Sequence, residues 1–277
     1  SVSAFLLNRS SDLSFIVKYP YSSAAAGKKG KFGFFNSEKD AYRRIAQELG
    51  IPCLSEAGEP LRYARHPLVY LVEAADDICY EIMDLEDAHK LKIISHEETM
   101  QLLLGFFDAE SQQHILQRIK EEGVTDNNEK VVYLRACVIG KLENECVRVF
   151  VEHEEEILNG TFDGSLIDRI STLQQEAYKR CCDFSVKRIY KSRPVLDVEL
   201  SGYQIIQTLM QKFIGAAVHP DRFYSKHLIS RVSSQYDIDA PDLETRLMAI
   251  IDYISGMTDV YALDIYQKIN GISLPII

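Results

Sequence analysis

Apolar residues return every three or four positions over most of the chain, and this spacing constrains the fold more than any other feature. From about residue 128 to 158 the apolar positions are Val131, Leu134, Val138, Leu142, Val147 and Val151. This period places apolar side chains along one face of an α-helix. Runs of the same period, with helix start and stop signals, occupy residues 37–50, 67–91, 95–105, 108–123, 165–184, 202–218, 220–236 and 242–268, the last broken near Ser255 and Gly256. The sequence therefore predicts an all-α fold with many helices.

One place departs from the helical period. Residues 186–190 and 195–200 form two short runs rich in valine and leucine on either side of Arg193 and Pro194. Such runs around a turn signal are typical of a strand pair. The sequence predicts a small two-stranded β element here.

Composition excludes several classes of protein. Of 277 residues, 46% are hydrophobic, and only 14 are glycine and 8 proline, so disordered and fibrous chains are excluded. No apolar run approaches the length that spans a membrane, and no secretory signal is present. The chain begins at Ser1 and its first methionine is Met83, which leads us to expect part of a longer protein.

The net charge of −10 argues against a general nucleic-acid-binding protein. The charge is uneven, because residues 1–36 hold five basic residues and one acidic one (Arg9, Lys18, Lys28, Lys29 and Lys31 against Asp12). A local charge of +4 suits a small anion such as a phosphate group. A solvated, lysine-rich loop is the alternative interpretation.

The six cysteines show no Cys-x-x-Cys spacing, and several fall within apolar helical patterns. Buried, reduced thiols have this pattern, which predicts a cytoplasmic location and no zinc site.

Residues 66–87 carry an acidic stripe on an otherwise apolar helix. Asp76, Tyr80 and Asp84 stand four residues apart, so they lie near one helical face, and Glu73 and Asp87 fall on or beside it. One interpretation is an amphipathic helix whose acids face water. The other is a divalent cation bound to Asp76, because aspartate is a weak helix former and small alanines beside it leave room for an approaching group.

Three ordered segments resemble the bacterial dGTPases, the deoxynucleoside-triphosphate triphosphohydrolases of the HD-domain superfamily. The first is Lys18-Tyr19-Pro20 with Gly33-Phe34-Phe35-Asn36-Ser37-Glu38, the second is the stripe at 66–87, and the third is Gly256-Met257-Thr258-Asp259. Together they span nearly the whole chain, although residues from about 108 to 200 add little to the resemblance.

The resemblance implies an HD-domain-like helical core, with its C-terminal part at residues 1–105 and a helical region packed on it at 106–277, the two forming one continuous domain. It implies hydrolysis of a dNTP, with dGTP as the expected substrate, by a water bound to a divalent metal such as Mg²⁺ or Mn²⁺. Asp76 would be the final metal ligand, Tyr80 would pack on the deoxyribose, and Asp84 would accept from its 3′-OH. Lys18, Tyr19 and Lys31 would hold the triphosphate. Homo-oligomeric assembly is implied too, with residues 128–158 and 165–184 as its candidate surface.

One departure from the family is large. The family places a histidine and then a His-Asp pair before the final aspartate, and none of the seven histidines here precedes an aspartate. His66 is better explained as a structural residue at a helix start. We therefore expect a C-terminal portion of a dGTPase-like protein, inactive alone. The alternatives are a non-catalytic nucleotide-binding or oligomerisation module and a helical protein-interaction domain.

Overall fold

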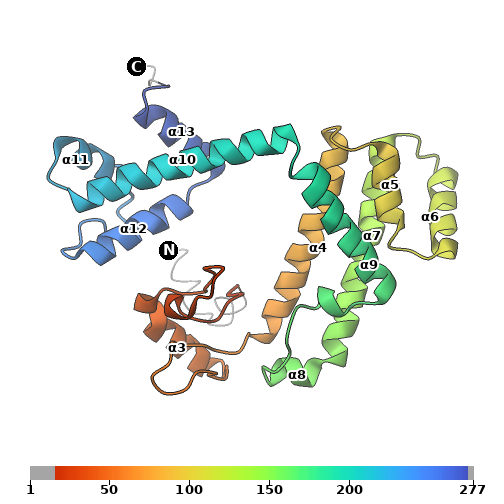
Figure 1. The fold of residues 1–277 in the computed structure, drawn as a ribbon, viewed down its shortest axis with the longest axis horizontal. Helices are drawn as coiled ribbons and strands as arrows, with labels where there is room; N and C mark the ends of the chain where they lie inside the picture. Colours follow the sequence, from red (N-terminus) through yellow and green to blue (C-terminus); the bar gives the residue numbers. More distant parts are fainter. Residues whose placement is uncertain (1–15, 274–277) are drawn as a thin grey trace. The chain divides into compact units, whose positions relative to one another are not determined.

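A computed structural model describes residues 16–273, which form eleven α-helices and no strand (Figure 1). Arg9 and Asp12, which contribute to the predicted basic segment, lie outside the described residues. The helices are α3 (Lys39–Glu48), α4 (Pro67–Lys90), α5 (His96–Leu104), α6 (Ala109–Glu121), α7 (Asn127–Glu152), α8 (Glu154–Leu158), α9 (Thr172–Phe184), α10 (Arg193–Val218), α11 (Phe223–Ile229), α12 (Leu243–Ser255) and α13 (Asp259–Ile269). Three isolated β-bridges join loop residues before α4. The prediction of an all-α fold is confirmed.

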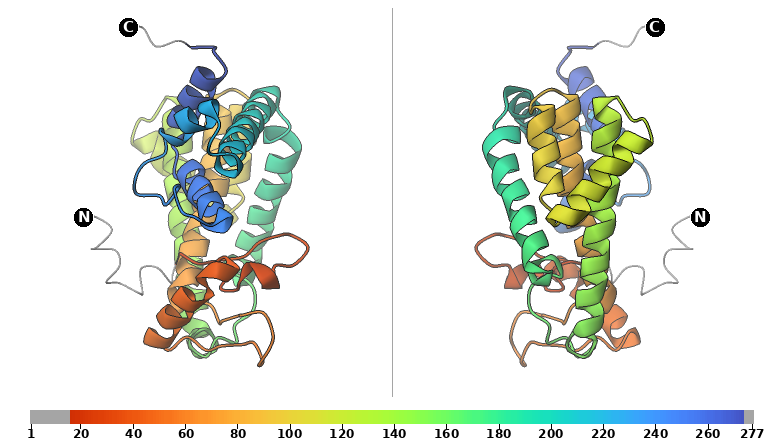
Figure 2. Two further views of the ribbon diagram at one scale, coloured as in Figure 1. Left: turned by 90° about the vertical axis from the view of Figure 1, so that its left-hand side faces the viewer. Right: turned by 90° about the vertical axis from the view of Figure 1, so that its right-hand side faces the viewer.

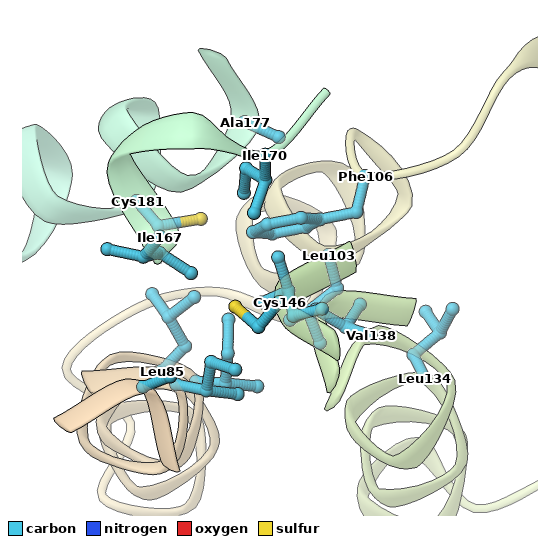
Figure 3. Packing of buried hydrophobic residues seen from close by; sticks show 14 of the residues in the cluster. Leu85, Leu103, Phe106, Leu134, Val138, Cys146, Ile167, Ile170, Ala177 and Cys181 are labelled. Carbon is cyan, nitrogen blue, oxygen red and sulfur yellow. The ribbon is translucent and has the colours of Figure 1, made fainter. Parts of the chain in front are cut away.

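The chain divides into two compact units with the boundary between Tyr190 and Lys191. In the first unit α4 packs along α7, α5 contacts both of these helices, and α9 contacts α4 and α5 (Figure 2). Apolar side chains from these helices and from the turn after α5 fill the core between them, among them Leu85, Leu103, Phe106, Leu134 and Cys146 (Figure 3). α4 is therefore held along one side by the core.

A smaller cluster lies in the segment before α4. Phe34 stacks on Tyr42 with ring centroids 4.4 Å apart, and Tyr63 packs beside them. This cluster fixes the loops that carry Lys18 and Tyr19.

The second unit has its own core. α10 packs against α11, α12 and α13, and Leu209, Phe213 and Ile250 are fully buried among them. The Gly256-Met257-Thr258-Asp259 segment joins α12 to α13, where Thr258 caps α13 by accepting from the Tyr261 N–H. The predicted break near Ser255 and Gly256 is confirmed.

The predicted β element is wrong. Ser185–Ile189 continues α9 as a π-helical turn, and α10 begins at Arg193, with Pro194 in its first turn. Proline is well tolerated there because the first N–H groups of a helix have no partner within it. The valine and leucine runs that favoured strands instead lie on helical backbone, where Val198 is 74% exposed.

Other boundaries also shifted. The predicted helix at 128–158 is interrupted at His153, and the one at 220–236 is reduced to α11. The helix starts predicted from the clearest capping signals are confirmed. Ser95 and Glu98 form a reciprocal capping box at the start of α5, and Pro67 stands in the first turn of α4.

The six cysteines are free thiols, of which Cys146 and Cys181 are buried. No helix within residues 16–273 is long and apolar enough to cross a membrane.

Glu145 on α7 provides a pH-dependent contribution to stability. Burial alone would raise its pKa, but the hydroxyl and N–H of Ser171 and the guanidinium of Arg148 donate to the carboxylate and hold the pKa at about 2. The unfolded pKa is near 4.5, so this stabilisation is present above that pH and is lost as the pH falls towards 2. The difference corresponds to about 3 kcal/mol.

We therefore expect Glu145→Gln to lower the free energy of unfolding at pH 7 and to flatten its pH dependence below about pH 4.5. Urea denaturation between pH 3 and 7 measures both effects. Glu143→Gln, at an exposed neighbour on the same helix, is the control. Equal losses in the two variants would contradict this role for Glu145.

Candidate functional site

α4 presents one face to the core and leaves the opposite face open. The helix starts where the His66 ring accepts from the Leu68 N–H at 3.2 Å, which agrees with the predicted structural role of this histidine. Ala74, Ile78, Ile82 and Leu85 are buried on the core side. The packing that fixes α4 thus leaves a second face available for contacts with other groups.

Asp76, Tyr80 and Asp84 lie on the open face. Asp76 is exposed, Tyr80 is 62% exposed and Asp84 is half-buried. Apolar side chains flank them, with Leu68, Val72 and Met83 each exposed by a little over 40%. Helical spacing places these three apolar side chains along one side of the row formed by Asp76, Tyr80 and Asp84, so the open face combines acidic, aromatic and apolar surface.

Tyr190 is a neighbour of this face that the sequence did not predict. Its hydroxyl donates to Asp84 Oδ2 at 2.7 Å, and its ring centroid lies 6.4 Å from that of Tyr80. Burial, followed by the hydrogen bond to Asp84, raises the pKa of Tyr190. The π-helical turn before it is attached to α4 as well, because the Ser185 hydroxyl donates to buried Glu81 at 2.7 Å. Because residues 186–190 were predicted to form a strand, this contact could not be predicted.

A cavity of about 630 Å³ opens beside the first half of α4. Lys18 and Tyr19 line it, together with Arg62, Arg65, Glu73, Asp77 and residues 160–165 and 168. Two of the predicted phosphate-binding residues therefore share a cavity with side chains of the acidic helix.

Glu73 connects two cations in this cavity. Its Oε1 lies 3.2 Å from Lys18 Nζ, and its Oε2 accepts from Arg65 Nη1 at 2.8 Å. Burial would lower the pKa of Lys18, but the hydrogen bond and charge of Glu73 outweigh it and raise that pKa. Burial raises the pKa of Asp77. The positive charge of the Lys18 ammonium, 3.9 Å away, acts in the opposite direction and limits this rise. Glu73 is thus a buried bridge, and does not belong to the exposed stripe.

Tyr19 and Lys31 are also brought together. Lys31 Nζ donates to Tyr19 Oη at 3.2 Å and lies 5.4 Å from the ring centroid, although Lys31 does not line the cavity. Gly33 permits this arrangement, because a Cβ at that position would stand 2.2 Å from the carbonyl oxygen of Tyr19. Only glycine allows the two segments to approach so closely.

No group of three metal-ligating side chains occurs among residues 16–273. Asp76 is a single exposed carboxylate. A catalytic divalent cation needs several protein ligands, so the described residues do not fit one by themselves.

Comparison with known proteins shows which proteins the chain resembles. A family model described as "Phosphohydrolase-associated domain" matches residues 169–268, which includes only the last part, residues 169–200, of the region that contributed little to the sequence resemblance. A "Deoxyguanosinetriphosphate triphosphohydrolase-like protein" of Pseudomonas aeruginosa is 31% identical over 94% of this chain and 59% of its own length, and one of Listeria monocytogenes is 32% identical with the same coverage. A "Deoxyguanosinetriphosphate triphosphohydrolase" of Yersinia pestis is 26% identical over 86% of this chain and 53% of its own length.

The helical fold and these matches define a phosphohydrolase-related protein. More narrowly, the chain belongs to the dGTPase-like triphosphohydrolase family. It spans about 59% of the length of the first two relatives.

Proposed function

We propose that the protein is a metal-dependent deoxynucleoside-triphosphate triphosphohydrolase with dGTP as its preferred substrate. The reaction adds water across the bond between the α-phosphorus and the 5′ oxygen, giving the deoxynucleoside and tripolyphosphate. The observation that carries the proposal is the position of Asp76, Tyr80 and Asp84 on one open face of α4, the helix that also lines the cavity holding Lys18 and Tyr19.

The roles follow from the chemistry of each side chain. Asp76 contributes one ligand to a divalent cation, Mg²⁺ or Mn²⁺, whose remaining ligands come from outside the described residues. Tyr80 packs its exposed ring on the deoxyribose. Asp84 accepts from the 3′-OH through Oδ1, since Oδ2 already accepts from Tyr190. Lys18, Tyr19 and Lys31 contact the triphosphate.

The charges around the cavity support a metal complex as the ligand. Three basic side chains line it (Lys18, Arg62 and Arg65) against four acidic ones (Glu73, Asp77, Asp163 and Asp168). A free polyanion gains little from such a balanced lining. A triphosphate that arrives with divalent cations brings the positive charge that the lining lacks.

Two further proposals accompany this function. The first is a cytoplasmic location, where thiols stay reduced. The second is homo-oligomeric assembly, for which α7 and α9 remain the candidate surface. The residues proposed for the nucleotide all precede residue 106.

The test is product analysis on the protein encoded by the whole gene. We expect dGTP with Mn²⁺ or Mg²⁺ to give deoxyguanosine and tripolyphosphate in equal amounts, measured by anion-exchange chromatography, and a chelator to stop the reaction. Parallel assays with the other three dNTPs measure base preference. Binding of dGTP without any product would favour the non-catalytic nucleotide-binding module, and release of monophosphate would exclude triphosphohydrolysis.

A further inference from the structure

Glu73 holds Lys18 at two points. The carboxylate pairs directly with the Lys18 ammonium at 3.2 Å. It also fixes Arg65, whose Nε donates to the Lys18 backbone carbonyl at 3.1 Å. One side chain therefore restrains both the main chain and the terminal charge of this lysine.

The bridge leaves Lys18 able to contact a ligand. An ammonium has three donors, and the structure pairs it with Glu73 at hydrogen-bonding distance and with Asp77 only at 3.9 Å. The side chain stays 36% exposed and lines the cavity, whereas Glu73 is 8% exposed. The buried group restrains a partner that remains accessible.

We propose that Glu73 is a positioning residue, which orients the Lys18 ammonium towards the triphosphate. This inference rests on the proposed function, since it assigns Lys18 a phosphate to bind. A free lysine loses rotamer entropy when it is immobilised. Lys18 loses part of that freedom before the ligand arrives, which strengthens binding.

A purely electrostatic role predicts the opposite sign. Neutralising a carboxylate beside a phosphate-binding site removes repulsion and tightens anion binding. Orientation by Glu73 predicts weaker binding after the same change. The sign of the effect therefore separates the two roles.

The experiment is a double-mutant cycle on the protein encoded by the whole gene, with Mg²⁺-tripolyphosphate as the probe in isothermal titration calorimetry. We expect Lys18→Met and Glu73→Gln each to weaken binding by between about 3- and 30-fold. In the Lys18→Met background, Glu73→Gln should change affinity by less than about twofold, because Glu73 acts through Lys18.

Two further variants exclude loss of folding and simple charge effects. Glu86 is also a buried carboxylate on α4 and also pairs with two cations, Lys90 and Arg135, so Glu86→Gln should leave affinity unchanged. Glu73→Asp keeps the charge but shortens the side chain by one methylene, and should weaken binding with no change in net charge. Thermal unfolding of every variant reports its stability.

Several outcomes would overturn the inference. Equal or tighter binding by Glu73→Gln, or additive losses in the cycle, would show that Glu73 does not act through Lys18, and would leave the proposed function standing. Failure of the wild-type whole protein to bind the probe would remove the phosphate role of Lys18 itself, and the inference with it. Product analysis on the whole protein would then decide separately on the proposed function.

Discussion

Asp76→Ala is expected to reduce dGTP hydrolysis by at least about 100-fold in the protein encoded by the whole gene. Asp76 is exposed on the open face of α4 and makes no buried contact on which the fold depends. The loss should therefore come from the metal site and not from unfolding. Turnover is measured as tripolyphosphate release and metal content by mass spectrometry. Both quantities should fall in this variant.

Asp87→Ala is the matched control for this change. Asp87 is an exposed aspartate on the same helix, close to the same face but three turns further along. It should retain normal turnover and normal metal content. Full activity in Asp76→Ala would remove Asp76 from the metal site.

Tyr80→Ala is expected to relax discrimination against ribonucleotides. A ring placed against the C2′ of the sugar leaves no room for a 2′-OH, and truncation opens that space. Steric exclusion of a single hydroxyl lowers kcat/KM by at most about 100-fold. The ratio of kcat/KM for dGTP to that for GTP should therefore fall by between about 10- and 100-fold in the variant. Steady-state kinetics with both nucleotides measures the ratio.

Met83→Ala controls for the loss of apolar surface. Met83 lies on the same open side of α4 and is 43% exposed. We expect it to affect both nucleotides alike and to leave the ratio unchanged. A ratio in Tyr80→Ala equal to that of the wild type would contradict the contact with the sugar.

Local patterns predicted much of the fold. The capping box at Ser95 and the proline at the start of α4 depend on neighbours within one helical turn, which a sequence displays directly. The same local patterns failed at 186–190 and 195–200. There, packing on α4 and a proline in a first helical turn outweighed the β-preference of valine.

The candidate site was also predictable only in part. The spacing of Asp76, Tyr80 and Asp84 placed them near one face because they share a single helix. The partner of Asp84 and Tyr80 was not predictable, since Tyr190 reaches them only after the chain has folded. Tyr190, for example, stands 106 positions from Asp84. Such contacts leave no periodic trace in one sequence.

The unbroken course of α4 fixes the geometry of any ligand that its open face binds. With a rise of about 1.5 Å per residue, Asp76 and Asp84 stand about 12 Å apart along the axis. Inserting one residue between them would turn Asp84 by about 100° relative to Asp76. Substitutions can therefore alter either end of the face independently. A change in the length of this segment would instead move Asp76 and Asp84 onto different sides of the helix in a single step.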